Sequence, residues 1–343
     1  MQHTLKWTAI NSFIQYCLGN LPEQRQSHFW WFSIMNEIDT SKSITQKVIL
    51  PNSNSSIEVY LQREDLIHPF VNGNKYYKLK YNLKKAKEEN YDTLLTFGGA
   101  YSNHIYAVSA AAKLYGFKSI GIIRGEEYDP LNPTLQFAVN NGMTLHYLDR
   151  KTYRRRTDPE FRKKIAKHFG RVYIIPEGGT NELATKGTSE ILDNIEIDFD
   201  YLCSAVGSGG TLAGLIAGSN CSKNVIGFSS LKGGEYLTKT INELLPNSSI
   251  RKFANWEIIP DYHFGGFAKI NRELIEFVYE FKIENNIQLD LIYNGKMMYG
   301  INDLISRNYF PENSKIVAIH TGGLQGIEGM KPKIEKFMEK INL

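Results

Sequence analysis

The chain has 343 residues, which is enough for two domains with separate cores. Its 40 basic and 36 acidic residues leave a net charge of +4, a mild excess that favours small anionic ligands weakly and does not indicate nucleic acid. Three cysteines without a CxxC pair argue against a disulfide framework or a zinc site, and they are typical of a reducing cytoplasm. The eight histidines show no HxH or HExxH spacing, so no metal site is expected.

Residues 1–46 are expected to form an N-terminal extension of uncertain role. They contain no apolar run long enough for a membrane span or a signal peptide. Residues 1–34 are interpreted as a peripheral extension or an upstream mis-start, because Met35 precedes a polar leader that looks like an ordinary start. The alternative is a helix that carries the aromatic run Phe29–Phe32 into a subunit contact.

From Ile57 onward, apolar strands alternate with helices. The expected strands are 57–62, 93–97, 119–123, 144–148, 172–175, 201–206, 224–229 and 315–320. The expected helices are 75–90, 102–115, 134–140, 158–169, 182–194, 211–218, 236–245, 272–284, 296–307 and a last one ending at Ile341. This alternation predicts an α/β fold with two twisted, mostly parallel sheets covered by helices on both faces, joined near Gly178-Gly179. Ligand crevices in such folds lie at the carboxyl ends of the strands.

The segment Val71–Leu79 places Lys75 at the glycine-marked start of a predicted helix. Lys78 lies one turn further on and shares its face. Nearby positive charge and desolvation both lower the pKa of a lysine from its reference near 10.4, which frees the amine to attack a carbonyl. Taken alone, the segment also fits an ordinary helix with lysines on its solvent face. The loops downstream favour the reactive lysine.

The first of these loops, Gly98–His104, follows a predicted strand and leads into a helix at Ser102-Asn103. The free N–H groups at a helix start form a site for a carboxylate or a phosphate. Plain N-capping by Ser102 or Asn103 is the structural alternative, although a cap does not require two glycines in front of it.

The second loop, Val206–Gly214, reads VGSGGTLAG and allows successive backbone N–H groups to curl around a phosphate. A dinucleotide motif fails because Leu212 stands where the third glycine of GxGxxG belongs, and no acidic residue follows at the ribose distance. A Walker loop fails for lack of GK[ST]. A monophosphate cradle is therefore predicted, with a purely structural turn as the alternative.

Two further segments complete the picture. His320–Gly323 is another helix entrance made of small residues, and Leu289–Gly300 places Tyr293 beside a glycine turn, where its ring packs either on a flat ligand or in the core. A lysine that takes a carbonyl, a phosphate ester, a flat ring and a carboxylated substrate together describe pyridoxal 5′-phosphate with an amino acid. The basic run from Arg150 to Lys164 is interpreted as a solvated helix face rather than a nucleic-acid patch, because it has few aromatic residues.

The motifs GNKYYKL, TFGGAYSNH, VGSGGTLAG, LDLIYNGKMMYG and HTGG resemble the 1-aminocyclopropane-1-carboxylate deaminase/D-cysteine desulfhydrase family. That family belongs to the tryptophan-synthase-β-like, or type II, pyridoxal-phosphate enzymes. We expect residues 47–79 and 177–343 to form a larger cofactor-binding domain, and residues 80–176 a smaller α/β domain. The resemblance also implies a homodimer that acts on a small amino acid, without nucleic-acid or membrane partners.

The resemblance assigns roles to residues at matching positions. Lys75 would form the Schiff base with the cofactor, and Lys78 would lie near its phosphate. Tyr293 would pack beside the ring, and Asn294 would meet the pyridine nitrogen. The other cofactor-binding residues implied are Asn103, Thr321 and the phosphate loop of Gly207, Ser208, Gly209, Gly210 and Thr211. The implied substrate-binding residues are Ser102, Asn103, His104 and Phe267, and the implied catalytic residues are Lys75, Ser102 and Tyr293.

Three positions depart from the family pattern. Tyr77 replaces the arginine of GNKxRKL, Asn294 replaces a glutamate of the deaminase branch, and Phe267 replaces a tyrosine of that branch. Opening a cyclopropane needs strong electron withdrawal through a protonated ring, which a carboxylate partner supports and an amide does not. We therefore favour D-cysteine desulfhydrase-type β-elimination to pyruvate, ammonia and sulfide. The alternatives are 1-aminocyclopropane-1-carboxylate deamination, a non-catalytic pyridoxal-phosphate-binding protein, and a nucleic-acid binder acting through Arg154–Arg156.

Overall fold

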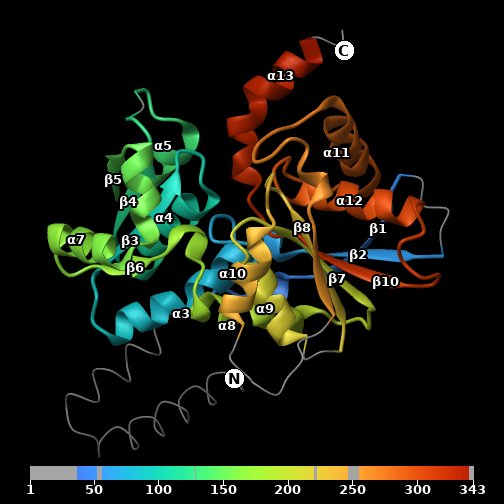
Figure 1. The fold of residues 1–343 in the computed structure, drawn as a ribbon, viewed down its shortest axis with the longest axis horizontal. Helices are drawn as coiled ribbons and strands as arrows, with labels where there is room; N and C mark the ends of the chain where they lie inside the picture. Colours follow the sequence, from blue (N-terminus) through green and yellow to red (C-terminus); the bar gives the residue numbers. More distant parts are fainter. Residues whose placement is uncertain (1–36, 52–55, 128, 220–221, 246–254, 340–343) are drawn as a thin grey trace, which may run out of the picture. The chain divides into compact units, whose positions relative to one another are not determined.

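The computed structural model of the protein describes residues 37–51, 56–127, 129–219, 222–245 and 255–339. The expectations for residues 1–34 lie outside these ranges. The described strands form two sheets, one of six strands and one of four (Figure 1). Within the described residues, no helix is both long enough and apolar enough to cross a bilayer.

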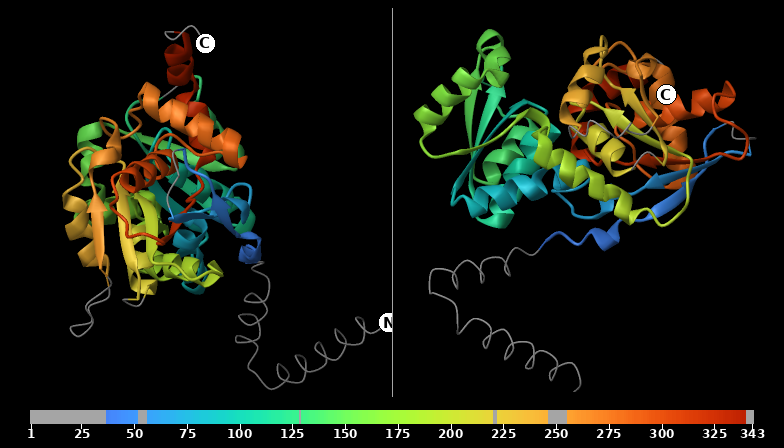
Figure 2. Two further views of the ribbon diagram at one scale, coloured as in Figure 1. Left: turned by 90° about the vertical axis from the view of Figure 1, so that its right-hand side faces the viewer. Right: turned by 60° about the horizontal axis from the view of Figure 1, so that its bottom comes forward.

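The larger sheet has the strand order β1-β2-β10-β7-β8-β9. Its strands are β1 (Thr45–Val48), β2 (Glu58–Gln62), β7 (Tyr201–Val206), β8 (Asn224–Ser229), β9 (Trp256–Ile259) and β10 (Lys315–Ile319). All neighbours are parallel except β1, which runs antiparallel to β2. Figure 2 shows β1 and β2 (blue) on one side of this sheet and β9 (gold) on the other. The short outer strands β1 and β9 were not predicted, because they lack the continuous apolar run of a central strand.

The smaller sheet has the order β5-β4-β3-β6, and all its strands are parallel. Its strands are β3 (Thr93–Gly99), β4 (Lys118–Arg124), β5 (Met143–Leu148) and β6 (Tyr173–Ile175). Thus β2, although it comes first among the predicted strands, lies in the larger sheet, and the chain enters the smaller sheet only after it. The domain division at residues 80 and 176 stays a prediction.

Helices cover both faces of each sheet, as predicted (Figure 1). The α-helices are α3 (Asn74–Glu88), α4 (Asn103–Tyr115), α5 (Pro133–Asn140), α6 (Arg150–Tyr153), α7 (Pro159–Phe169), α8 (Glu182–Ser189), α9 (Gly210–Gly218), α10 (Tyr236–Leu244), α11 (Arg272–Asn285), α12 (Asn294–Ser306) and α13 (Lys331–Glu339). Short 3-10 turns are η1 (Thr40–Lys42), η2 (Glu64–Leu66), η3 (Arg154–Thr157), η4 (Glu177–Gly179), η5 (Glu190–Asn194), η6 (Asp261–His263) and η7 (Leu324–Met330). The expected helix end at Ile341 lies outside the described residues.

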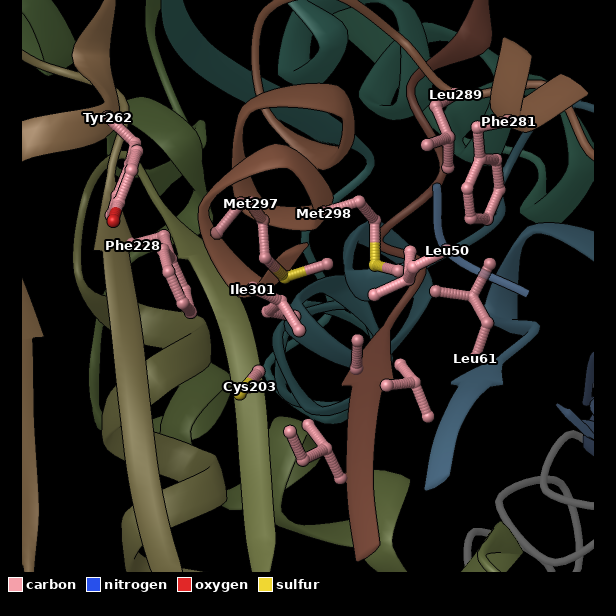
Figure 3. Packing of buried hydrophobic residues seen from close by; sticks show 14 of the residues in the cluster. Leu50, Leu61, Cys203, Phe228, Tyr262, Phe281, Leu289, Met297, Met298 and Ile301 are labelled. Carbon is pink, nitrogen blue, oxygen red and sulfur yellow. The ribbon is translucent and has the colours of Figure 1, made fainter. Parts of the chain in front are cut away.

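The main core lies between the larger sheet and the helices α11 and α12 (Figure 3). Alternate strand residues face it, such as Cys203 from β7 and Phe228 from β8. From α12, the side chains of Met297, Met298 and Ile301 are fully buried in this cluster. This packing holds the start of α12, directly after Tyr293, in a fixed place at the end of the sheet.

Candidate active site

A cavity of about 830 Å³ lies at the carboxyl ends of strands from both sheets. That volume is in the range of small-molecule and cofactor pockets. Twelve of the predicted site residues line it: Lys75, Lys78, Ser102, Asn103, His104, Gly207, Ser208, Gly209, Thr211, Phe267, Tyr293 and Thr321. Gly210 and Asn294 do not line it.

Lys75 stands in the first turn of α3, beside a point where two loops touch. Gly73 precedes the helix with φ +57°, and a Cβ placed there would lie 2.0 Å from the carbonyl oxygen of Thr321, so this close approach requires glycine. The amine Nζ of Lys75 donates to Oδ1 of Asn74 at 2.8 Å. Burial lowers the pKa of Lys75 to about 8, opposed in part by the negative charge of Asp290. The predicted reactive lysine therefore has a readily deprotonated amine, and burial is the main cause.

Lys78 is 2% exposed and points from α3 to the loops opposite. Its Nζ donates to the carbonyl of Gly178 at 3.0 Å, to Oγ of Ser208 at 3.2 Å and to Oγ1 of Thr180 at 3.3 Å. Burial, followed by the charge of Lys75, holds the pKa of Lys78 well below its usual value. A bound anion would stabilise its charged form.

The predicted phosphate loop follows β7 and opens α9. Gly209 has φ +84° and precedes the helix, whose first N–H groups have no acceptor within the helix. Asn74 Nδ2 donates to Oγ1 of Thr211 at 2.8 Å, which ties this loop to the start of α3. A Cβ at Gly210 would lie 3.0 Å from Thr180 and 3.3 Å from Nζ of Lys78. The loop, α3 and Lys78 thus form a small cradle of hydrogen-bond donors at a helix N-terminus, which suits a phosphate.

The loop after β3 carries the predicted substrate-binding residues. Ser102 caps α4, since its Oγ accepts from the N–H groups of His104 and Ile105 at 3.2 and 3.3 Å. The capping alternative is therefore confirmed as a fact of the structure, while a role in substrate binding stays a prediction. Oδ1 of Asn103 accepts from Nε2 of Gln325 at 2.7 Å, so the loop after β10 holds this side chain.

His104 is 2% exposed and sits between the two lysines and the smaller sheet. Its Nε2 shares a hydrogen bond of 2.8 Å with Oγ1 of Thr96, and its Nδ1 has no hydrogen-bond partner among the described residues. Burial, followed by the charges of Lys75 and Lys78, lowers the pKa of His104 well below its usual value. The imidazole is therefore neutral and offers a buried nitrogen to a ligand.

Two aromatic rings stand beside the phosphate loop. The centroids of Tyr293 and Phe267 lie 6.0 Å apart with an interplanar angle of 64°. A Cβ at Gly207 would lie 3.0 Å from Cε1 of Tyr293, so the ring packs directly on the glycine loop. Burial, followed by the charges of Asp290 and Glu177, raises the pKa of the Tyr293 phenol. Tyr293 thus presents a neutral ring at the position predicted for one that packs on a flat ligand.

Asp290 positions this turn and was not singled out from the sequence. Its carboxylate accepts from the backbone N–H groups of Ile292, Tyr293 and Asn294 and, at 2.6 Å, from Nδ2 of Asn294. An aspartate in a turn that leads into a helix is the signal that points to such a role, because its carboxylate can accept from backbone N–H groups a few residues later.

Asn294 lies behind the cavity wall. Its Nδ2 also donates to the carbonyl of Gly322 at 3.0 Å, and its Oδ1 accepts from N and Oγ1 of Thr321 at 3.0 and 3.1 Å. A contact between Asn294 and the pyridine nitrogen stays a prediction, and it requires one of these bonds to be exchanged. Thr321, its hydrogen-bond partner, does line the cavity.

Lys296, in the first turn of α12, holds the loop that carries Phe267. The side chain is 1% exposed, and Nζ donates to the carbonyls of His263 and Gly266 at 2.8 and 2.9 Å. Burial lowers the pKa of Lys296 to about 8, opposed by Asp290. Sequence reasoning missed this residue because its partners are about 30 residues away in the chain.

Arginines from the basic run also reach the cavity. Arg150, Arg156 and Arg162 line it together with Arg124, the last residue of β4. Arg150 is exposed and Arg162 is half-exposed, as expected for a solvated face, but these residues of the run also line the cavity, which was not predicted. The reason is that the run begins directly after β5, at the carboxyl edge of the sheet where the cavity lies.

Comparison with known proteins identifies the relatives of this chain. Residues 41–322 match the model of a family described as pyridoxal-phosphate dependent enzyme. The chain is similar to a putative 1-aminocyclopropane-1-carboxylate deaminase of Pyrococcus horikoshii, with 32% identity over 289 residues that cover 81% of this chain and 88% of the relative. It is similar to the bifunctional D-cysteine desulfhydrase/1-aminocyclopropane-1-carboxylate deaminase, mitochondrial, of Arabidopsis thaliana, with 30% identity covering 81% of this chain and 75% of the relative. A crystal structure described as an ACC deaminase homologue superposes with a TM-score of 0.75 at 27% identity, covering 90% of this chain and 98% of that one.

The cavity residues fit pyridoxal phosphate. A buried lysine with a lowered pKa meets the need for an amine that condenses with an aldehyde. The glycine loop, the start of α9 and Lys78 meet the need for a phosphate site. The ring of Tyr293 and the unpartnered Nδ1 of His104 supply an apolar surface and a polar contact.

Proposed function

The chain belongs to the family of pyridoxal-phosphate dependent enzymes, and we propose that it is a lyase that removes a β-substituent from a small amino acid. D-Cysteine is the model substrate, with pyruvate, ammonia and sulfide as products. The family resemblance predicted from the five motifs is confirmed by the relatives of Pyrococcus horikoshii and Arabidopsis thaliana. The observation that carries the proposal is the half-buried Lys75, whose pKa is lowered and which lines the same cavity as the phosphate cradle.

When bound, pyridoxal phosphate withdraws electrons from Cα of the substrate. The residues of this chain hold both molecules and move the proton. Lys78 and the N–H groups at the start of α9 bind the phosphate. The N-terminus of α4 binds the substrate carboxylate, which takes N–H groups that donate to Oγ of Ser102 in this structure. Nζ of Lys75, whose pKa is lowered to about 8, accepts the proton of Cα.

Deamination of 1-aminocyclopropane-1-carboxylate is the second candidate, because the relatives carry that name. The residues at positions 294 and 267 argue against this deamination. The amide of Asn294 is bonded to Asp290, Gly322 and Thr321, and no carboxylate stands in its place. Phe267 has no hydroxyl, although its ring stands beside Tyr293 where a phenol would enter the cavity.

A panel of D- and L-amino acids with the purified holoprotein tests the proposal by the keto acid released. We expect pyruvate and sulfide from D-cysteine, and little 2-oxobutanoate from 1-aminocyclopropane-1-carboxylate. The reverse preference would support the deaminase. Bound cofactor without keto acid from any substrate would contradict catalysis and favour a binding protein.

We further propose that the protein is a homodimer, on the family resemblance alone, that it is cytoplasmic, on its cysteine content, and that the described chain divides into the two predicted domains. Sedimentation velocity of the holoprotein tests the dimer, and a single species of monomer mass would contradict it.

A further inference from the structure

Arginines gather at the carboxyl edge of the smaller sheet. Arg124 ends β4, and Arg150 begins α6 directly after β5. Arg156 lies in η3 and Arg162 in α7, and all four line the cavity that holds Lys75. Two neighbouring connections of one sheet, those that follow β4 and β5, thus bring four arginines to the cavity where the substrate would lie.

Carboxylates do not balance these charges. Of these four arginines, only Arg156 has an acidic partner among the described residues, namely Glu177 at 2.5 Å, and Glu177 also accepts from the hydroxyl of Tyr153. Nε of Arg162 donates to the carbonyl of Arg156 at 2.7 Å, and burial together with the charge of Arg156 lowers the pKa of Arg162. Three guanidinium groups, those of Arg124, Arg150 and Arg162, therefore face a shared cavity without an ion-pair partner among the described carboxylates.

The cluster borders the reacting end of the cavity. Arg124 pairs with Gly99 in the register of β4 and β3, and its Nη2 lies 3.6 Å from the place that a Cβ on Gly99 would take. Gly99 leads into the turn at Ser102. On the other side, Glu177 is followed by Gly178, whose carbonyl accepts from Lys78. An anion bound by the arginines would therefore stand close to both the carboxylate turn and the phosphate cradle.

We propose that Arg124, Arg150 and Arg162 bind a second anionic group on the side chain of the substrate. The substrate class is a small amino acid whose β-substituent is an anion, such as a phosphate ester, because guanidinium groups match the geometry of phosphate oxygens. This inference rests on the proposed elimination. In that step the proton of Cα goes to Nζ of Lys75, the bond from Cβ to the ester oxygen breaks, and its electron pair leaves with the phosphate. The remaining aminoacrylate takes up water and yields pyruvate and ammonia.

Binding to the holoprotein by calorimetry tests the inference without turnover. The anionic probe is D-2-amino-3-phosphonopropanoate, which has no ester bond to break, and the neutral probe is D-2-aminobutanoate. We expect the anionic probe to bind at least about tenfold more tightly, since one charge-assisted contact of this kind is worth roughly that factor. Equal affinities would overturn the proposal.

Arginine variants locate the contact. Arg124→Gln and Arg150→Gln should each lower the affinity for the phosphonate probe only a few-fold, because both arginine side chains are exposed and water screens their charge. Arg162 is half-buried, and the double variant Arg124→Gln/Arg162→Gln should lower the affinity for the phosphonate probe about tenfold. The neutral probe should bind alike throughout. Circular dichroism confirms that each variant is folded.

Arg154→Gln is the matched control, since Arg154 belongs to the same basic run, is exposed and does not line the cavity. It should leave both affinities unchanged. An equal loss in this variant would mean that overall charge, not the cavity, attracts the anion, and would overturn the proposal. So would RNA binding that depends equally on Arg154 and Arg162.

Turnover separates this inference from the proposed function. For pyruvate release, kcat/KM should be higher with O-phospho-D-serine than with O-acetyl-D-serine. The double variant Arg124→Gln/Arg162→Gln should reverse this order. Release from neutral substrates alone would leave the lyase standing and refute the anionic class. A preference for the phosphonate without any keto acid would refute the lyase and keep the anion site.

Discussion

The two walls of the cavity are built in opposite ways. The wall from the larger sheet consists of glycine turns and closed hydrogen bonds, with Gly73 against Thr321 and Asn294 between Asp290 and Thr321. The wall from the smaller sheet carries long cationic side chains, of which Arg124 and Arg150 are exposed. Closed hydrogen bonds keep a wall in one geometry, whereas solvated side chains adapt to what binds.

This difference separates two tasks. A cofactor that is retained through every turnover needs the fixed wall, where glycine allows the backbone to come close. In the proposed function, the β-substituent of the substrate meets the adaptable wall. Disturbing each wall should therefore have a different signature: loss of cofactor and chemistry on one side, and altered preference for substrates on the other.

The largest effect is expected for Lys75→Ala, at the fixed wall. Without the amine, keto-acid release should fall by about 10²–10⁴-fold, the usual contribution of a positioned general base. Lys84→Ala, on the exposed side of the same helix, is the control and should keep full activity. Unchanged turnover in Lys75→Ala, with an intact circular dichroism spectrum, would remove Lys75 from the mechanism.

The lowered pKa of Lys75 is measurable in the cofactor-free protein. Only the uncharged amine reacts with acetic anhydride, so the labelling of Lys75 should rise with a midpoint near pH 8. A lysine in water has its midpoint near 10.4, and the difference corresponds to roughly a few hundredfold more free amine at neutral pH. Mass spectrometry of the labelled peptide over a pH series gives the midpoint. A value above 10 would show that burial does not activate this lysine.

Gly73→Ala tests the close approach of the two loops. The new Cβ would overlap the carbonyl oxygen of Thr321, so the backbone must move, and we expect a loss of about 1–3 kcal/mol in the free energy of unfolding. Gly116→Ala also has a positive φ, +72°, but open space around its Cβ, and should cost only about 1 kcal/mol. Chemical denaturation of both variants measures the difference. Equal losses of unfolding free energy in the two variants would mean that the positive φ alone, and not the close approach of Thr321, requires glycine at position 73.

The smallest effect is expected for Lys296→Met, which releases the loop of Phe267. Two carbonyls lose a donor, but a buried cation is also removed, so we expect a net loss of about 1 kcal/mol together with a higher KM. Lys269 is exposed in the same loop, and the control variant Lys269→Met should change neither the free energy of unfolding nor KM.

The same variant has a pH signature. Because the pKa of Lys296 is lowered to about 8 in the folded protein, the unfolded chain binds more protons between pH 8 and 10, and stability rises with pH in that window. This rise should be smaller in Lys296→Met. An identical rise in stability with pH in both proteins would show that a group other than Lys296 titrates in this range.

Sequence patterns predicted the fixed wall well. The strands Tyr201–Val206 and Asn224–Ser229 occur at the predicted bounds, and the predicted loops that follow β7 and β10 reach the cavity. These features are local, because a glycine turn after an apolar run determines both the strand end and the helix start. The edge strands β1 and β9 were missed because their patterns are short and partly polar.

The adaptable wall could not be predicted in the same way. Whether Arg150 and Arg162 face solvent or the cavity depends on the sheet order β5-β4-β3-β6, which brings segments far apart in the chain to one edge. The contact made by Tyr77, which replaces an arginine of the family pattern, also depends on the tertiary fold. Its hydroxyl donates at 2.6 Å to the buried Glu64, 13 residues earlier in the chain. Such partners follow from packing and not from local pattern.

Reduction of the holoprotein with borohydride, followed by peptide mapping, tests the central claim most directly. The reagent fixes the cofactor to the lysine that holds it. We predict one modified peptide, with the pyridoxyl group on Lys75. A label on Lys78, Lys296 or another lysine, or no label at all, would contradict the assignment of this cavity as the catalytic centre.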